Sequence, residues 1–374
     1  MLIGVDASRA VSGQRTGTEA YAYHLIQALI PLARQQGYRL RLYLNGAPEP
    51  AAFPNAAGVE QRVMPFQRLW THVRLARELR QNPPDVFFTP AHVIPFSCRI
   101  PSVATVHDLG YHYFPAAHPP AQRAYLQVTT WHNVHRSRRV LADSQATKGD
   151  LVHLYHADPT KVNVVYPGID TALKPVRDSE LLASAQQKYG IHGPYLLYLG
   201  TLQPRKNLVR LLAAFAAAAL SCQLVLAGKT GWLAQPIHEA VEALPAQIRE
   251  RVLLPGYVSD EDKAALLSGA TALVFPSLYE GFGFPLLEAQ ACGTPVLAAN
   301  SSSLPEIAGG SALLCDPLDT KALTEGLRRL ASDQPLRAQL VEKGFQNVRR
   351  FDWQEAARAV LQTLEAAAGL STGN

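Results

Sequence analysis

The sequence is poor in the residues that build disulfide frameworks and metal sites. Its 374 residues include only four cysteines, Cys98, Cys222, Cys292 and Cys315, and these are scattered without a CxxC pair. The histidines show no HExxH pattern, so we expect no protein-bound metal. The chain also opens without the basic and apolar segments of a secretory signal. These absences predict a reducing, cytoplasmic environment.

Long apolar runs and low-complexity tracts are also missing. The most apolar helix-like run, residues 211–220, is too short to cross a bilayer. The chain is 48% hydrophobic and 17% charged, which is the composition of a globular protein and excludes extensive disorder. Its length exceeds the size at which one hydrophobic core usually stops growing, so we expect two domains.

Positive charge is concentrated in the first half of the chain. Residues 1–180 contain 19 basic and 13 acidic side chains, which would suit an anionic partner. Within them, segment 66–80 alternates basic and apolar residues and predicts a basic amphipathic helix. Such a helix either contacts the inner face of a membrane peripherally or is an ordinary surface helix with a solvated basic face. No nucleic-acid partner is expected, because no known binding motif is present.

Short β-rich runs alternate with helical stretches, a pattern that predicts an α/β fold of two doubly wound domains with parallel sheets. The proline- and glycine-containing segment 167–193 is the candidate linker. Ligands of such sheets bind beyond the carboxyl ends of the strands, so we expect the site in a cleft between the domains. The expected strands lie near 2–6, 40–44, 86–89, 102–106, 139–143, 161–166, 195–199, 223–227, 252–254, 272–275, 295–298 and 312–314. The expected helices include 18–35, 121–135, 208–219, 260–268, 285–291 and 319–331.

Two glutamates eight residues apart flank a glycine-rich turn in segment 276–289. Glu280 would lie in the loop after a buried strand, and Glu288 one turn into the following helix. The start of that helix would favour an anion such as a diphosphate, Glu288 would accept hydrogen bonds from ribose hydroxyls, and Glu280 would face a sugar. The alternative is a plain turn with two solvated glutamates. The backbone N–H groups expected to be available at the helix start are those of Gly281, Phe282, Gly283 and Phe284.

An adjacent cation pair, Arg205 and Lys206, follows another predicted strand through Gly200 and Thr201. Cations at the start of a helix are disfavoured by its dipole unless an anion binds there. A diphosphate would satisfy both side chains, whereas the alternative is a solvated charge pair. Further on, Lys229 and Val258 follow two more strands, and their position alone suggests that they frame a nucleobase.

The first half offers two weaker signals. Loop 6–18 leads through Gly17 and Thr18 into the first long helix, which is the position of a phosphate or substrate loop, yet it matches neither GxGxxG nor a Walker motif. His107 and Asp108 stand at the carboxyl end of a strand. That histidine either hydrogen-bonds a sugar hydroxyl or bonds locally to its own loop.

Taken in order, these motifs resemble those of the retaining glycosyltransferases of the GT-B fold, in the group-one or family-four class that includes bacterial mannosyltransferases. The resemblance covers nearly the whole chain and is strongest over 200–207, 255–258 and 276–295. It implies two Rossmann-like domains facing each other across a cleft. Residues 1–178 would be the acceptor-side domain, with a helix in 351–374 packing back on it, and 179–350 would bind the nucleotide sugar.

The resemblance also implies residue roles. Arg205 and Lys206 would neutralise the donor diphosphate, and Glu280 with the amides of 281–284 would hold the sugar. Glu288 would bind the ribose, and His107 would contact the transferred sugar. The family often has a Gly-Gly pair in its first loop, whereas this chain has Gly17 followed by Thr18.

The implied reaction transfers a hexose with retention of configuration to a glycan or lipid-linked acceptor in polysaccharide or glycolipid synthesis. GDP-mannose is the first choice of donor and a UDP-hexose the second, with no bound cofactor. Two alternatives stay open: a nucleotide-sugar epimerase of the same fold, and a non-catalytic nucleotide-sugar-binding partner of another transferase. The acceptor cannot be identified from the sequence.

Overall fold

The computed structural model describes residues 1–374 except 12–16, 48–51, 54–56, 67, 92 and 371–374. Parts of the first loop, of segment 66–80 and of the C-terminal segment 351–374 therefore lie outside the described residues. The chain divides into two compact units, each with its own sheet. The first unit comprises Met1–Leu109, Pro120–Gly168 and Phe351–Asn374, and the second comprises Gly110–Pro119 and Ile169–Arg350.

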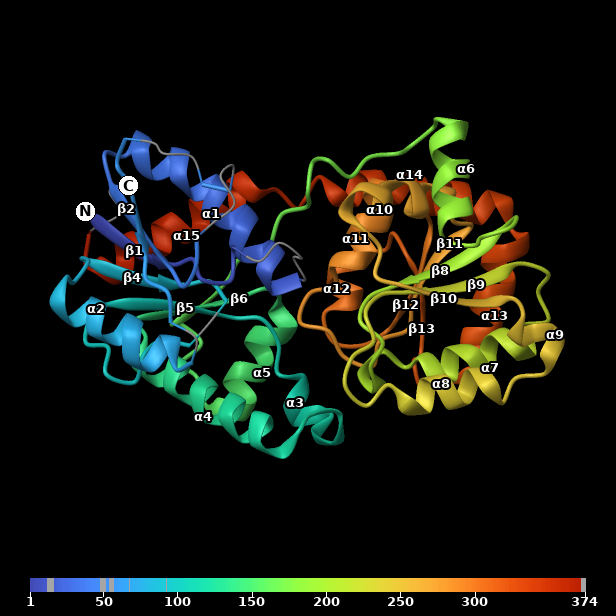
Figure 1. Cartoon of the computed structure of the whole chain (residues 1–374), viewed down its shortest axis with the longest axis horizontal. Helices are drawn as coiled ribbons and strands as arrows, with labels where there is room; N and C mark the ends of the chain where they lie inside the picture. Colours follow the sequence, from blue (N-terminus) through green and yellow to red (C-terminus); the bar gives the residue numbers. More distant parts are fainter. Residues whose placement is uncertain (12–16, 48–51, 54–56, 67, 92, 371–374) are drawn as a thin grey trace. The chain divides into compact units, whose positions relative to one another are not determined.

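The first unit is built on a seven-stranded sheet in the order β3-β2-β1-β4-β5-β6-β7 (Figure 1). All its neighbouring strands run parallel. The central strands are short apolar runs with every residue buried, as expected of strands covered on both faces. The strands are β1 (Leu2–Asp6), β2 (Arg39–Leu44), β3 (Val59–Val63), β4 (Val86–Thr89), β5 (Ser102–Val106), β6 (Arg139–Ala142) and β7 (Val162–Val164).

Helices cover both faces of this sheet (Figure 1). Helices α1 (Gly17–Gln35) and α15 (Trp353–Ala368) pack against each other on one face. The other face carries η1 (Trp70–Leu75), a π-helical turn, followed by α2 (Ala76–Gln81), α4 (Pro120–Arg136) and α5 (Gln145–Tyr155). In the part of the chain that the structure describes, no helix has the length and apolar character needed to cross a membrane.

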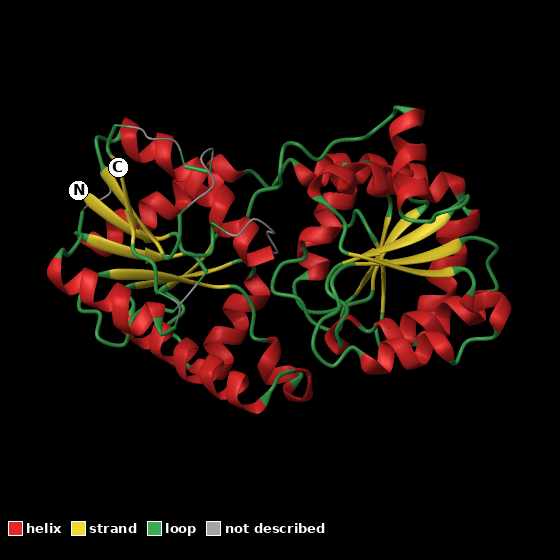
Figure 2. Ribbon diagram, viewed as in Figure 1, coloured by secondary structure: helices red, strands yellow, loops and turns green. Residues whose placement is uncertain are grey.

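The second unit repeats the architecture with a six-stranded parallel sheet in the order β10-β9-β8-β11-β12-β13, enclosed between helices (Figure 2). Its strands are β8 (Tyr195–Leu199), β9 (Gln223–Ala227), β10 (Val252–Gly256), β11 (Ala272–Phe275), β12 (Val296–Ala299) and β13 (Leu313–Cys315). Its helices and 3-10 turns are α3 (Gly110–Tyr113), η2 (Pro115–Ala117), α6 (Ser179–Lys188), η3 (Pro204–Lys206), α7 (Leu208–Ala218), α8 (Gln235–Glu242), α9 (Ala246–Arg249), α10 (Asp260–Gly269), α11 (Phe284–Ala291), α12 (Leu304–Ala308), α13 (Thr320–Ser332) and α14 (Gln334–Val348).

The order of strands reverses direction once in each sheet, between β1 and β4 and between β8 and β11. Doubly wound sheets bind their ligands at this point, beyond the carboxyl ends of the strands, because the loops there lead to opposite faces. In the second unit the loop after β8 carries Arg205 and Lys206, and the loop after β11 carries Glu280. The fold therefore places these charged side chains at the switch point.

The predicted fold class is confirmed, and every predicted strand is present with bounds shifted by at most two residues. Three details differ from prediction. An additional strand, β3, forms the edge of the first sheet. The segment 167–193 is not a plain linker, since it contains α6. The predicted helix over 66–80 begins only at Trp70, because Leu69 has left-handed backbone angles with φ of 56°.

Candidate active site

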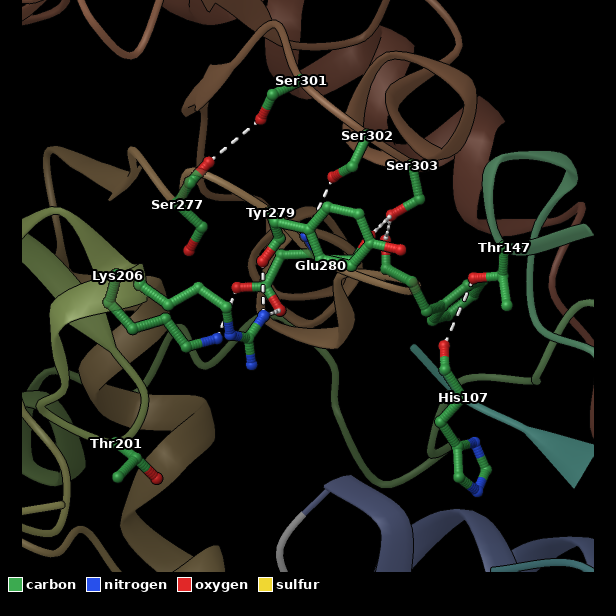
Figure 3. Close-up of polar contacts among 12 residues, drawn as sticks. His107, Thr147, Thr201, Lys206, Ser277, Tyr279, Glu280, Ser301, Ser302 and Ser303 are labelled. Atoms are coloured by element: carbon green, nitrogen blue, oxygen red, sulfur yellow. Dashed lines mark hydrogen bonds and ion pairs between the residues drawn. The ribbon is translucent and has the colours of Figure 1, made fainter. Parts of the chain in front are cut away.

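Glu280 lies at the centre of a buried charge cluster at the switch point of the second sheet (Figure 3). Its Oε2 accepts a hydrogen bond from Arg205 Nη1 at 3.1 Å, and its Oε1 pairs with Lys206 Nζ. All three side chains are largely buried, with exposed side-chain fractions of 10–12%. The anion that the adjacent cations require is therefore supplied, in this structure, by the protein itself.

The two cations share the carboxylate of Glu280. Burial by itself raises the pKa of Glu280, but the charges of Lys206 and Arg205 and the hydrogen bond from Lys206 outweigh it and lower that pKa to about 2. Glu280 is thus ionised throughout the neutral range. A site that holds a guanidinium and an ammonium group in fixed, buried positions is suited to a diphosphate.

The backbone of the Glu280 loop is held by serines that follow β12 (Figure 3). Ser302 Oγ accepts a hydrogen bond from Glu280 N at 2.8 Å. Ser303 Oγ donates to Glu280 O at 2.9 Å and to Phe282 O at 2.8 Å, and Ser301 Oγ donates to Ser277 O at 3.0 Å. On the opposite side, Arg205 Nη1 donates to Tyr279 O. The loop is therefore pre-organised by two neighbouring strands.

Local geometry explains why the cation pair stands where it does. Asn207, with φ of 62°, separates the turn η3 from helix α7, and its Nδ2 donates to Pro276 O and to Pro317 O.

Two glycines allow the loops after β8 and β9 to touch. A Cβ on Gly228 would lie 1.9 Å from Gly200 O, and both glycines have positive φ.

Helix α11 begins directly after the loop, as predicted. Gly283 precedes it with φ of 116°, and a Cβ there would lie 2.7 Å from Leu304 Cδ2. Gly281 and Phe282 are buried, and Phe284 is half-buried. Glu288 lies one turn into the helix, where its Oε1 pairs with Lys263 Nζ at 3.3 Å. The Glu288 charge raises the pKa of Lys263.

The other predicted residues of the second unit line the loops around this cluster. Thr201 is half-buried, and its carbonyl accepts a hydrogen bond from Tyr198 Oη at 3.0 Å. Lys229 Nζ lies over the Tyr257 ring, 4.9 Å from its centroid. Val258 is buried. Contact of Lys229 and Val258 with a nucleobase stays a prediction.

His107 belongs to the first unit and has two hydrogen-bond partners there. Its Nδ1 lies 2.6 Å from Asp143 Oδ2, its Nε2 lies 2.8 Å from Pro90 O, and the Tyr21 ring meets its edge at 4.7 Å. The Pro90 carbonyl only accepts hydrogen bonds, so Nε2 is the donor to it, and the Asp143 carboxyl beside Nδ1 favours the protonated imidazolium. Burial alone lowers the pKa of His107, but Asp143 and the Pro90 carbonyl raise it overall.

The first loop contributes little that the structure describes. Gly17 and Thr18 form the exposed start of helix α1. Residues 12–16 lie outside the described residues, so the predicted contact of this loop with a ligand stays a prediction.

The structure thus gathers Arg205, Lys206 and Glu280 into one cluster and places Glu288 on the adjoining helix. Sequence reasoning missed several partners, namely Lys263, Asp143 and the serines 301–303. A usable signal existed for Asp143, which ends the strand predicted at 139–143, and for the serines, which begin three residues after the strand predicted at 295–298. Within the described ranges, no group of three His, Cys, Asp or Glu side chains is arranged to hold a metal ion.

Two doubly wound units with parallel sheets, of which the second carries a charged cluster at its switch point, have the architecture of the GT-B fold. The family described as "Glycosyl transferases group 1" matches residues 184–347, and "Glycosyltransferase Family 4" matches residues 15–173. The chain belongs to this group of glycosyltransferases.

Relatives and solved structures agree with this assignment. O-antigen chain mannosyltransferase B of Escherichia coli is 29% identical over 297 residues, 78% of this chain and 76% of the relative. A D-inositol 3-phosphate glycosyltransferase of Salinispora tropica is 34% identical over 60% of this chain, a match that spans half of that relative's length. Sucrose-phosphate synthase from Thermosynechococcus elongatus superposes with a TM-score of 0.78 at 21% identity, covering 99% of this chain and 100% of the other. Anabaena Alr3699/HepE in complex with UDP-glucose superposes with a TM-score of 0.75 at 19% identity, covering 98% of this chain and 99% of the other.

Proposed function

We propose that this glycosyltransferase moves a hexose, with mannose favoured, from a nucleoside diphosphate sugar to a hydroxyl of a glycan or lipid-linked acceptor. The observation that carries the proposal is the Arg205–Glu280–Lys206 cluster, which gathers two buried cations around a glycine-rich loop at the switch point of the sheet. In this proposal, residues 1–178 with the helix of 351–374 form the acceptor side. Residues 179–350 bind the donor.

Within the donor site, Arg205 and Lys206 bind the diphosphate, because a guanidinium fork and an ammonium match its oxygens. Glu280 and the amides of 281–284 hold the sugar, and Glu288 accepts hydrogen bonds from the ribose. Lys229 and Val258 flank the base, while Gly200 and Thr201 bring the backbone close to the donor. His107 and the loop at Gly17 and Thr18 contact the transferred group from the first unit.

The proposed chemistry is a same-face substitution at the anomeric carbon. The bond from that carbon to the leaving phosphate oxygen breaks, and a bond to the acceptor oxygen forms on the same face with retention of configuration. The acceptor proton passes to the leaving phosphate oxygen. Arg205 and Lys206 stabilise the negative charge that develops on the diphosphate, and this stabilisation accelerates the reaction because it grows toward the transition state.

Mannose and GDP-mannose are the first choices because a mannosyltransferase stands among the relatives. A UDP-hexose is the second, since a solved neighbour binds UDP-glucose. The O-antigen mannosyltransferase among the relatives supports a role in polysaccharide or glycolipid synthesis. We place the protein in the cytoplasm, or peripherally at the inner face of a membrane that it contacts through residues 66–80.

Calorimetric titration of the protein with GDP-, UDP- and ADP-sugars tests the donor, with Glu288→Ala as the site variant. Binding of one donor that is weakened in Glu288→Ala supports the proposal, and no binding of any donor contradicts it. An NMR time course with the bound donor and no acceptor then separates transfer from epimerisation, because an epimerase converts the donor alone. With an acceptor present, the anomeric signals of the product report retention or inversion.

A further inference from the structure

A short segment between β5 and α4 is folded into the second unit, although the residues on both sides of it belong to the first. It runs from Gly110 to Pro119 and contains α3 and η2, and we call it the 110–119 strap. The strap begins shortly after His107 and contains no Asp, Glu, Lys or Arg, so it brings no permanent charge to the donor site. Any part that it plays there is through its contacts with other residues.

One end of the strap contacts the loop that carries Glu280. The Tyr113 ring of α3 stacks on the Tyr279 ring, with centroids 5.1 Å apart and planes inclined by 26°. Tyr279 directly precedes Glu280 (Figure 3), is only 5% exposed, and its carbonyl accepts the hydrogen bond from Arg205 Nη1. An aromatic pair holds its two rings in a defined geometry. Tyr113 therefore restricts the backbone position to which Arg205 is bonded.

The other end of the strap contacts the loop after β9. Trp232 Nε1 in this loop donates a hydrogen bond to Ala117 O, and the Trp232 ring lies 5.8 Å from the His118 ring, measured between centroids. The indole N–H is the one donor of the tryptophan side chain, so this bond fixes which edge of the ring faces the strap.

The loop after β9 is bonded in turn to the loop after β8, which leads to the cation pair. Leu202 N donates to Lys229 O at 2.9 Å, and Gly231 N donates to Leu202 O at 2.9 Å. Trp232 follows Gly231 directly. The strap is thus connected, through Trp232, to the loop after β8.

We propose that the 110–119 strap positions the loops of the donor site, with Tyr113 and Trp232 as positioning residues. Arg205 and Glu280 stand on different loops, so their pairing requires both loops to keep their places relative to each other. One segment that contacts both sides supplies this constraint and reduces the cost of ordering the loops when a donor binds. The inference rests on the proposed function, since it takes the charge cluster as the donor site.

Hydrogen exchange of the intact chain without any ligand tests the positioning directly. In Tyr113→Ala, the amides of 277–283 should exchange about three- to tenfold faster, which is the loss of one aromatic pair expressed as a rate. In Trp232→Phe, which keeps a ring but removes the N–H donor, the amides of 229–233 should exchange faster by a similar factor. Tyr113→Phe keeps the stacked ring and should exchange as the wild type does.

Calorimetric titration with GDP-mannose and with UDP-glucose gives a second readout. Tyr113→Ala and Trp232→Phe should each raise the Kd of the donor that binds the wild type by about three- to tenfold. In the double variant, Kd should rise little beyond that of the weaker-binding single variant, because release of either end frees the strap. Two independent contacts would instead give the product of the two single effects.

Matched controls come from the first unit. Tyr125→Ala removes a tyrosine that is 47% exposed, compared with 46% for Tyr113. Trp131→Phe changes an exposed tryptophan that, like Trp232, lies beside a histidine ring. Both controls should keep the wild-type exchange of the two loops and the wild-type Kd, and thermal unfolding verifies that every variant is folded.

Wild-type exchange of both loops in Tyr113→Ala and Trp232→Phe overturns the proposal, and so does faster exchange with an unchanged Kd. Fully multiplicative effects in the double variant also overturn it, because the strap would then not act as one segment. If the wild type binds neither nucleotide sugar, the proposed function is contradicted, while hydrogen exchange still decides whether the strap positions the loops.

Discussion

At the scale of single residues, Glu280 acts as a resident counter-ion. It holds Arg205 and Lys206 in place before any ligand arrives, so neither side chain has to be ordered when a diphosphate binds. A bound diphosphate would compete with the carboxylate for the same two cations. The site is therefore pre-organised for a diphosphate, but competition from the Glu280 carboxylate should reduce its affinity for that ligand.

The role of Arg205 gives the first prediction. Arg205→Ala removes one charge from the leaving diphosphate and should reduce kcat by about 10²–10³-fold, comparable to the loss of one oxyanion donor. Arg205→Lys keeps the charge but loses the guanidinium fork, so its kcat should lie between that of the wild type and that of Arg205→Ala. Steady-state transfer assays measure both. Unchanged turnover in Arg205→Ala would show that this side chain does not serve the leaving group.

The pairing of His107 with Asp143 gives a prediction on pH dependence. Because the pKa of His107 is raised in the folded protein, the pair stabilises the fold fully below the unfolded histidine pKa of about 6.5, and that contribution is lost as pH rises through the raised value. Asp143→Asn should lower the pKa of His107. Its loss of unfolding free energy should be largest in weakly acidic solution, where the imidazolium faces an ionised Asp143, and should shrink toward alkaline pH.

NMR titration of the His107 ring measures this pKa directly, with a His107→Gln spectrum for assignment. Asp158→Asn, at an exposed position of the same unit, should leave the titration unchanged. Identical titration curves for the wild type and Asp143→Asn would mean that the carboxylate does not hold the imidazolium. If His107 acts in the reaction as its charged form, kcat/KM should fall at alkaline pH as His107 loses its proton. In Asp143→Asn that fall should shift to lower pH together with the pKa of His107.

Linear spacing could identify some of these residues and not others. Arg205, Lys206 and Glu280 were predictable because each stands in the loop directly after a strongly apolar strand. Their mutual pairing was not, because it depends on β8 and β11 being neighbours across the switch point. Lys263 was hidden for a related reason, since it reaches Glu288 from another helix.

At the scale of elements, the serine loop after β12 determines the shape of the Glu280 loop. Ser303 is fully buried and donates to two carbonyls. Ser303→Ala should lower the free energy of unfolding by about 1–3 kcal/mol, because it leaves buried acceptors without a donor. It should also weaken donor binding, as the loop loses its support.

Chemical denaturation and donor titration measure the two effects. Ser332→Ala is the matched control, since that exposed hydroxyl bonds only to its own helix at Arg328 O. A Ser303→Ala protein with wild-type donor affinity would show that the loop keeps its shape without this serine.

The contact between the loops after β8 and β9 gives a second prediction at this scale. Gly228→Ala would place a methyl group 1.9 Å from Gly200 O at a residue with φ of 147°, so we expect severe destabilisation or failure to fold. Gly149→Ala is the matched control. Gly149 lies inside helix α5 with no heavy atom within 4 Å of the added carbon, so it should gain up to about 1 kcal/mol. Denaturant titrations of both variants test the pair.

The edge strand β3 was missed by the prediction, whereas the edge strands β7, β10 and β13 were predicted. Strand β3 reads Val-Glu-Gln-Arg-Val and looks polar, but its backbone pairs with β2 and Glu60 bonds Arg41 at 2.7 Å. An edge strand needs little apolar character because one side stays solvated. Segment 66–80 shows the opposite case. Trp70, Leu75 and Leu79 enter the core while Leu69 and Val73 stay exposed, a division that only the π-helical turn reveals.

At the scale of the whole molecule, each unit has its own sheet and core, so a ligand of one unit should stabilise that unit more than the other. Saturating the donor site at a hundredfold excess over Kd should add about 2.7 kcal/mol to the second unit. Fluorine NMR of fluorotryptophan-labelled protein separates the units, because Trp232 lies in the second and Trp70, Trp131 and Trp353 in the first. In urea with donor nucleotide, the native Trp232 signal should persist longest. Equal shifts of the urea unfolding midpoints of all four tryptophan signals would show that the two units unfold as one.

The return of the chain to the first unit at Phe351 has a consequence for biosynthesis. Helix α15 covers β4, β5 and β6, which leave the ribosome long before it does. The second unit is complete once Arg350 has emerged, whereas the first must wait for its last helix. The usual order, in which the N-terminal domain matures first, is therefore reversed. A nascent chain carries an uncovered apolar sheet face through most of translation, which makes it a natural client for ribosome-associated chaperones.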